Sequence, residues 1–281
     1  MTTLAFRLVN VFARDAILTG NPLCVFEDGR GVDDATMQAL ARQFNLSETT
    51  FILPSDRATA RVRIFTPFYE MPFAGHPTLG TANVVRSIAR TGDAITLDMK
   101  AGIIPVAASG NRWTLSANAP RWREVEESRA ELADILGLET ADILDRPLWV
   151  NAGKEQLMVP VVSPDAVHRA RPRADAFSRL KSEDGHSMAY VFADSADAKA
   201  NVVSRFFFPS GPAILEDPAT GSACANLGGW FRALRAGDDV VRTVSQGDEV
   251  NRPSTLYLSV KSGAVSVGGD VVELARGSLN L

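Results

Sequence analysis

An internal repeat, with a period of about half the chain, constrains the fold of this sequence more than any other feature. Residues 63–85, RIFTPFYEMPFAGHPTLGTANVV, resemble residues 205–231, RFFFPSGPAILEDPATGSACANLGGWF. Both copies contain Arg-x-Phe-x-Pro followed by Pro-x-x-Gly-[Ser/Thr]-Ala, and a single-residue gap aligns them throughout. This period is too long for a solenoid unit, so the repeat predicts two duplicated lobes.

Each copy of the repeat predicts the same local structure. An apolar run rich in β-branched and aromatic residues indicates a buried strand, and a loop with proline and glycine follows it. The next segment, TLGTANVV or TGSACANL, is apolar on most sides with a helical period, so we expect a helix buried in the middle of each lobe. One such unit would be ordinary, but two in register favour a duplicated α+β fold.

The two predicted helix starts suggest a binding site. The backbone N–H groups at a helix N-terminus attract anions, and ligand sites often lie where two lobes meet. We therefore expect the two helix starts to hold one small carboxylate between the lobes.

The rest of the chain is predicted to be rich in strands. We place an N-terminal lobe over residues 1–117, completed by 270–281, and a C-terminal lobe over 118–269. Residues 118–127 form either a hinge or a surface loop. Helices are expected over 33–44, capped by Asp33 or Asp34, and over 124–136. Residues 254–279 predict a β-meander with turns at Ser262-Gly263 and Gly268-Gly269.

Composition narrows the class of protein. Of 281 residues, 46% are hydrophobic and 22% charged, as in ordinary globular proteins, and the net charge of −4 argues against a nucleic-acid surface. No apolar run approaches the roughly 20 residues that a membrane span needs. Cys24 and Cys224 make no disulfide framework, and no His, Cys or Asp grouping has metal-ligand spacing. A cytoplasmic protein without a metal site or membrane partner is expected.

Three strings carry a family resemblance when they occur in this order: NLSETTF, FAGHPTLGTAN and EDPATGSACAN, flanked by GNPLCVF and QGDEVNRPSTLYLSV. The chain resembles the PhzF-type, phenazine-biosynthesis-like family from end to end. The resemblance implies a diaminopimelate-epimerase-like fold: two pseudo-symmetric lobes, each a curved, barrel-like mixed sheet around a central helix. It also implies a homodimer that needs no cofactor.

The resemblance implies that Glu48 is the catalytic acid and base. One carboxyl group can remove a proton from one carbon and return it to another on the same face, and burial would keep part of it protonated. Without the family, Glu48 would more often be a helix-end carboxylate. His76 and Asp217 occupy equivalent positions of the repeat, and the resemblance places both at the substrate. Alternatively, His76 is a buried structural residue and Asp217 an N-cap.

Gly75, Gly221 and Ser222 are predicted to cradle the substrate carboxylate, although Ser222 could be only a helix cap. Related racemases with this fold use two cysteines, each directly before the glycine of its loop. Those positions are Ala74 and Thr220 here, so inversion by two thiols is not expected, and Cys224 is interpreted as a packing residue.

The leading hypothesis is a cofactor-independent isomerase that shifts a proton on a small carboxylate of the trans-2,3-dihydro-3-hydroxyanthranilate type. One alternative is a racemase or epimerase of an amino or hydroxy acid, with Glu48 and an unrecognised partner residue. The other is a family member that binds a ligand or a protein without catalysis.

Overall fold

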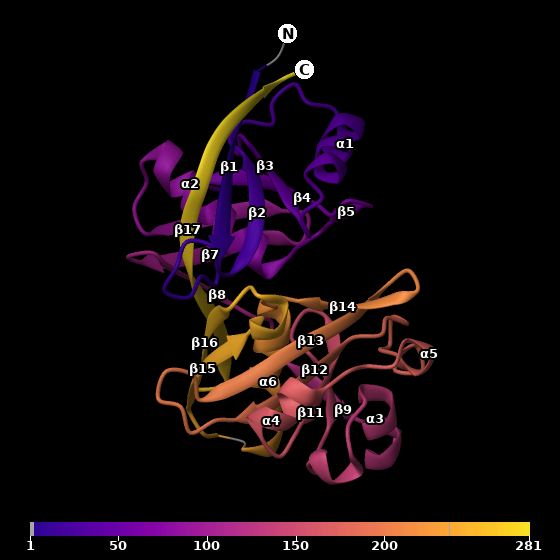
Figure 1. The fold of residues 1–281 in the computed structure, drawn as a ribbon. Helices are drawn as coiled ribbons and strands as arrows, with labels where there is room; N and C mark the ends of the chain where they lie inside the picture. Colours follow the sequence, from indigo (N-terminus) through magenta and orange to yellow (C-terminus); the bar gives the residue numbers. More distant parts are fainter. Residues whose placement is uncertain (1–2, 236) are drawn as a thin grey trace. The chain divides into compact units, whose positions relative to one another are not determined.

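The computed structural model describes residues 3–235 and 237–281, and their contacts divide the chain into two units. Unit 1 comprises Met1–Ser116 and Gly268–Leu281, and unit 2 comprises Ala117–Val267. The second boundary falls inside the long last strand, β17 (Ala264–Asn280), so the C-terminal residues of the chain belong to the N-terminal unit (Figure 1).

The wall of unit 1 is a mixed sheet that closes on itself. Strands pair in the order β17, β1, β2, β3, β4, β6, β7 and β8, and β8 pairs in turn with β17. The β2–β3 and β4–β6 pairs are parallel, and β5 forms a short hairpin with β4. The bounds are β1 (Thr3–Val11), β2 (Asn21–Phe26), β3 (Thr49–Leu53), β4 (Ala60–Phe65), β5 (Glu70–Met71), β6 (Ala94–Met99), β7 (Gly102–Ser109) and β8 (Arg112–Ser116).

Helix α2 (Gly75–Ala89) runs through the middle of this barrel. It contacts β1, β2, β3, β4, β6 and β8, and its residues from His76 to Ala82 are all buried. A Cβ atom on Gly80 would lie 2.6 Å from Leu23, so glycine allows the helix to approach the sheet. Helix α1 (Asp34–Phe44) is preceded by its N-cap Asp33, whose side chain accepts a hydrogen bond from the Thr36 N–H and confirms the predicted cap.

Unit 2 repeats this topology. The order β10, β11, β12, β13, β15 and β16 has parallel pairs at β11–β12 and β13–β15 and antiparallel pairs elsewhere, with β14 in a hairpin on β13. Helix α6 (Gly221–Leu234) contacts β9, β10, β11, β15 and β16. The other bounds are β9 (Arg121–Glu124), α3 (Arg129–Leu136), η1 (Thr140–Asp142), β10 (Leu148–Asn151), β11 (Glu155–Pro160), α4 (Pro164–Arg169), α5 (Ala174–Phe177), β12 (Ala189–Asp194), β13 (Val202–Ser210), β14 (Ala213–Asp217), β15 (Val240–Gln246), η2 (Asp248–Val250) and β16 (Ser254–Lys261). The predicted α+β class, a mixed sheet around a central helix in each half, is confirmed.

The Arg-x-Phe part of the repeat has the same structural role in both units. The arginine stacks on the phenylalanine two residues later, at 5.0 Å in unit 1 and 4.7 Å in unit 2. It also forms an ion pair with a glutamate on the neighbouring hairpin strand, at 2.8 Å and 2.6 Å respectively. These groups are Arg63, Phe65 and Glu70 in unit 1, and Arg205, Phe207 and Glu216 in unit 2.

Two local predictions are wrong. Gly268 and Gly269 form no turn but lie inside β17, where a Cβ on Gly269 would lie 2.1 Å from the Phe12 ring, so these glycines permit close packing. The helix expected from residue 124 begins at Arg129, because the capping box of Ser128 and Glu131 fixes its start. The predicted turn at residues 262–263 is confirmed.

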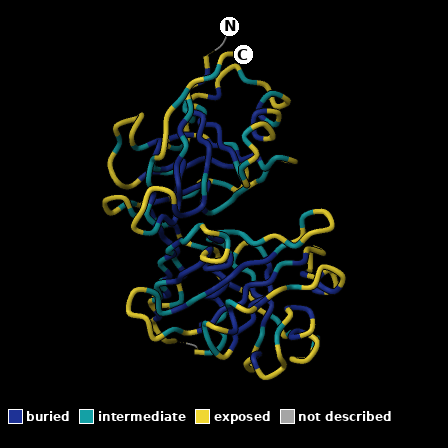
Figure 2. Tube along the Cα trace, in the orientation of Figure 1, coloured by how far each residue is buried: buried dark blue, intermediate teal, exposed yellow. Residues whose placement is uncertain are grey.

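Burial follows the strands and central helices. Figure 2 shows buried residues along the sheet and the central helix of each unit, and exposed residues in the connecting loops. None of the helices in the described ranges is both long and apolar enough to cross a membrane.

Candidate active site

The structure brings two of the predicted catalytic residues together in unit 1. Glu48 directly precedes β3, and His76 is the second residue of α2. Glu48 Oε2 lies 3.4 Å from His76 Nε2, and the two side chains are only 15% and 8% exposed. Gly75, a predicted substrate-binding residue, is the first residue of the same helix. A small movement of either side chain would make the contact a hydrogen bond.

The hydrogen bonds of His76 identify its tautomer. Burial lowers the pKa of His76 to about 3, although a hydrogen bond to the backbone of Pro22 acts in the opposite direction. Proline has no N–H, so its carbonyl accepts this bond from the ring. Among the described residues Nε2 has no hydrogen-bond partner, so Nδ1 is the donor. His76 is therefore neutral at physiological pH, and the lone pair of Nε2 can share one proton with Glu48.

The buried neutral His76 predicts a pH dependence of stability. The folded-state pKa is lowered from 6.5 to about 3, so below pH 6.5 the unfolded chain binds a proton that the folded chain does not. As the pH falls from 6.5 toward 3, we expect the unfolding free energy of wild type to decrease by on the order of 1.4 kcal/mol per pH unit relative to that of His76→Asn. Urea denaturation of both proteins from pH 7 to pH 4 measures this difference. Parallel stability curves would contradict the assignment.

The predicted residues of unit 2 cluster around the start of α6. Asp217 ends β14, and its carboxylate accepts a hydrogen bond from the Thr220 hydroxyl. Thr220 is the N-cap residue, and Gly221 and Ser222 are the first two residues of the helix. Neither Asp217 nor Ser222 therefore occupies the cap position. Among the described residues, no side chain caps the N-terminus of α2 or α6, so the N–H groups at the first two positions of each helix can receive an anion.

A buried glutamine that sequence reasoning missed holds this loop. Gln246, at the end of β15, is fully buried. Its Oε1 accepts from the Thr220 N–H at 3.3 Å, and its Nε2 donates to the Asp217 carbonyl at 2.8 Å and to Thr220 Oγ1 at 3.0 Å. Because Thr220 Oγ1 accepts from Gln246, its own hydrogen goes to the Asp217 carboxylate. The network fixes one oxygen of the Asp217 carboxyl group as an acceptor.

The cysteines do not provide an alternative acid and base. Cys24 on β2 and Cys224 within α6 are both fully buried, and burial raises the pKa of each thiol, so neither is a thiolate at neutral pH. Ala74 and Thr220 are the N-cap residues of the two central helices. In the described parts of the chain, no group of three or more His, Cys, Asp and Glu residues is arranged to hold a metal ion.

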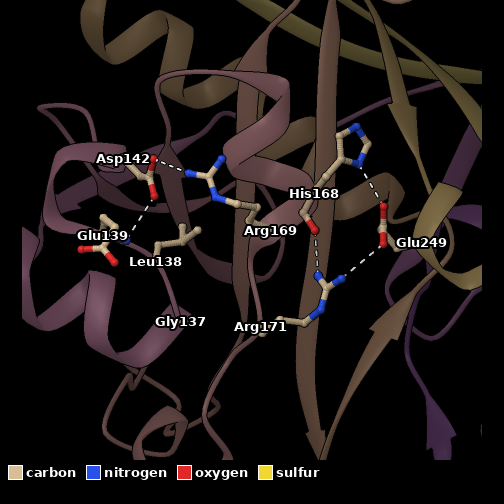
Figure 3. A pocket seen from close by; sticks show the side chains of 8 residues that line it. All are labelled: Gly137, Leu138, Glu139, Asp142, His168, Arg169, Arg171 and Glu249. Atoms are coloured by element: carbon tan, nitrogen blue, oxygen red, sulfur yellow. Dashed lines mark hydrogen bonds and ion pairs between the residues drawn. The ribbon is translucent and has the colours of Figure 1, made fainter.

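A hollow on unit 2 is lined by charged groups, but they neutralise one another (Figure 3). Arg169 pairs with Asp142 at 2.6 Å, and Glu249 pairs with His168 at 3.1 Å and with Arg171 at 3.5 Å. All of these side chains except Asp142 are about a third or more exposed to solvent. Solvent therefore screens the ion pairs, and each contributes little to stability. Glu48, His76 and Asp217 are not in its lining, and the hollow is not the candidate site.

The fold itself defines a class of proteins, those in which a mixed sheet around a buried helix occurs twice. A hydroxyproline epimerase of Agrobacterium vitis shares this fold, with a TM-score of 0.59 over 99% of this chain and 92% of that one at 11% identity. A phenazine biosynthesis protein of the PhzF family from Bacillus anthracis is far more similar, with a TM-score of 0.89 over the whole of both chains at 26% identity. The family model described as phenazine biosynthesis-like protein, PhzC-PhzF, matches residues 9–277, and the chain belongs to this family.

Relatives in this family are named isomerases. An uncharacterised isomerase of Pasteurella multocida is 36% identical over 99% of this chain and 95% of its own length. The trans-2,3-dihydro-3-hydroxyanthranilate isomerase of Pseudomonas fluorescens is 32% identical over 98% of both chains. The protein is therefore an enzyme of the isomerase class, as the sequence predicts.

Proposed function

We propose that this protein is a cofactor-independent isomerase that shifts a proton on a small carboxylate substrate, with Glu48 as the single acid and base. The observation that carries the proposal is the Glu48 Oε2 to His76 Nε2 separation of 3.4 Å between two side chains that are nearly buried. A carboxyl group paired with a neutral imidazole in a nearly dry environment is suited to exchange one proton with a substrate carbon.

The proposed reaction needs no electron acceptor. Glu48 removes a proton from one carbon of the substrate, the double bond shifts, and the protonated carboxyl group, whose proton exchanges with solvent in the intermediate, delivers a proton to a second carbon. His76 accepts a hydrogen bond from protonated Glu48 through Nε2 and so orients the acid before delivery. Because no electrons enter or leave the substrate, the products are isomers of the reactants.

The substrate carboxylate is proposed to bind at the uncapped helix starts. In this proposal the backbone N–H of Gly221 and the Ser222 hydroxyl donate to the carboxylate in unit 2, and Asp217 accepts from a polar hydrogen of the substrate. Gly75 of unit 1 is proposed as a further substrate-binding residue through its backbone N–H. The structure does not give Asp217 and His76 equivalent positions, because His76 lies inside α2 and Asp217 ends β14; the role of Asp217 is supported instead by its ordered carboxyl group beside the start of α6. Inversion by two thiols is not supported, because Ala74 and Thr220 carry no acid of the required kind.

The names of the relatives in Pseudomonas fluorescens and Pseudomonas aeruginosa point to the substrate to test, trans-2,3-dihydro-3-hydroxyanthranilate. We expect the purified protein to isomerise it after dialysis against EDTA, and proton NMR in D2O to show deuterium at the carbon that receives the proton. Inversion of configuration at one carbon without a shift of the double bond would instead identify an epimerase. Tight binding measured by calorimetry, with no conversion, would identify a protein that only binds its ligand.

A further inference from the structure

We propose that Gln156, oriented by Asn226, is a positioning residue that makes the Ser222 hydroxyl a hydrogen-bond donor to the substrate carboxylate. The proposal rests on the proposed function and deepens it, because it assigns the recognition of the carboxylate in unit 2 to a chain of hydrogen bonds with a fixed direction. All of its members lie on β11, α6 and the loop before β11.

The direction of the chain is set by the protein backbone. The N–H of Ala152 donates to Asn226 Oδ1 at 2.7 Å, and Asn226 Nδ2 donates to the carbonyl of Lys154 at 2.8 Å. A backbone N–H can only donate and a carbonyl can only accept, so these two bonds leave one orientation for the Asn226 amide. Asn226 is 1% exposed, which removes water as a competing partner.

Asn226 passes this direction to Gln156. Its second Nδ2 hydrogen is donated to Gln156 Oε1 at 2.8 Å, and Gln156 Nε2 therefore points to Ser222 Oγ at 3.0 Å. Gln156 is 2% exposed and, like Asn226, cannot rotate its amide without breaking a buried hydrogen bond. Ser222 Oγ therefore accepts a hydrogen bond from Gln156 and does not donate one to it.

The single hydrogen of the Ser222 hydroxyl therefore points away from Gln156 and is left for an acceptor outside the chain. Among the described residues, the only side-chain hydrogen bond of Ser222 is the one it accepts from Gln156. Ser222 is also the second residue of α6, beside uncapped backbone N–H groups. A carboxylate offers only acceptors and carries a full negative charge, so a hydroxyl hydrogen aimed at it favours a carboxylate over an ammonium group, which offers only donors, and over a primary amide, whose carbonyl is a neutral acceptor.

Gln156→Glu tests the direction of the chain without changing its shape. A carboxylate at this position still accepts from Asn226, but it cannot donate to Ser222, so the hydroxyl turns to donate to it and is lost to the substrate. We expect KM for trans-2,3-dihydro-3-hydroxyanthranilate to rise at least about 10-fold while kcat changes by less than about 3-fold, because a contact remote from the reacting carbons acts on binding. Acidification should reverse the defect, since the introduced carboxyl group donates again once it is protonated.

Ser222→Ala separates this effect from mere repulsion between the new charge and the substrate. In the Ser222→Ala background, Gln156→Glu should raise KM much less than in wild type, because the hydroxyl it reverses is absent. Gln43→Glu, on the exposed face of α1, is the control for added charge and should leave KM unchanged. An equal rise in both backgrounds, or a defect that low pH does not relieve, would overturn the proposal.

Binding measurements keep this test independent of turnover. Calorimetry with 3-hydroxyanthranilate, an aromatic analogue that cannot undergo the shift, and with its carboxamide should show that wild type prefers the carboxylate and that Gln156→Glu reduces the preference. Should Gln156→Glu fail to fold, Gln156→Met removes the donor and should reduce the preference by a smaller factor. If the folded Gln156→Glu variant still prefers the carboxylate over the carboxamide as strongly as wild type does, the role of Gln156 is contradicted. If wild type binds the ligand but does not turn over the substrate, only the proposed reaction is contradicted.

Discussion

Replacing Glu48 with glutamine is expected to lower kcat by about 10³- to 10⁴-fold, the upper range for removal of a general acid and base. The amide preserves the shape of the side chain but can neither take a proton from carbon nor return one. His76 cannot replace it, because its Nδ1 hydrogen is held by the Pro22 carbonyl and burial lowers the pKa of the ring to about 3. The measurement is the initial rate with trans-2,3-dihydro-3-hydroxyanthranilate, together with deuterium uptake in D2O.

The control for this variant is Glu126→Gln, at an exposed position of unit 2, which should keep full activity. Calorimetry with 3-hydroxyanthranilate should show that Glu48→Gln still binds the ligand, so that the loss is assigned to the chemical step. Full turnover by Glu48→Gln would refute the mechanism. Loss of both binding and turnover would show instead that Glu48 maintains the site rather than moving the proton.

The fold was predictable because the sequence shows its duplication directly. A strand, a loop and an apolar helix recur in the same order in both halves, and in the structure they become β4, β5 and α2 in unit 1 and β13, β14 and α6 in unit 2. The prediction of local structure fails at a glycine pair, because glycine can either form a turn or permit close packing within a strand. Gly268-Gly269 has the composition of a turn, but its role depends on Phe12, which is more than 250 residues away in the chain.

The sequence predicts the candidate site residues that lie within the motifs. It does not predict the residues that hold them in place by hydrogen bonds. Glu48, His76 and Asp217 stand in strings that the family resemblance marks. Gln156 and Gln246 act through hydrogen bonds to residues 66 and 26 positions away, and no local pattern predicts such partners. The available signal was weaker: each is a polar residue in an otherwise buried stretch of strand, and a buried amide requires partners.

The repeated arginine–glutamate pair provides the second large prediction, because the two copies differ in their surroundings. In unit 2, Arg205 and Glu216 are each 7% exposed, and Arg205 also donates to the carbonyls of Val167, His168 and Ala170. In unit 1, Glu70 has a second cation, because Lys100 Nζ lies 2.6 Å from its Oε2. The same substitution should therefore cost much more in unit 2 than in unit 1.

Arg205→Met is expected to lower the free energy of unfolding by about 3–5 kcal/mol, because it leaves the carboxylate of Glu216 buried without a cation. Arg63→Met, the matched variant, should cost only about 1–2 kcal/mol, since Lys100 still neutralises Glu70. Urea denaturation followed by tryptophan fluorescence measures both, with Trp122, Trp149 and Trp230 in unit 2 and Trp113 in unit 1. Adding Glu216→Gln to Arg205→Met should recover part of the loss by removing the stranded charge. The charge argument is contradicted if Arg205→Met and Arg63→Met lose the same unfolding free energy, or if Glu216→Gln restores none of it. The recurrence of arginine in both halves would then be due to packing of its aliphatic stem.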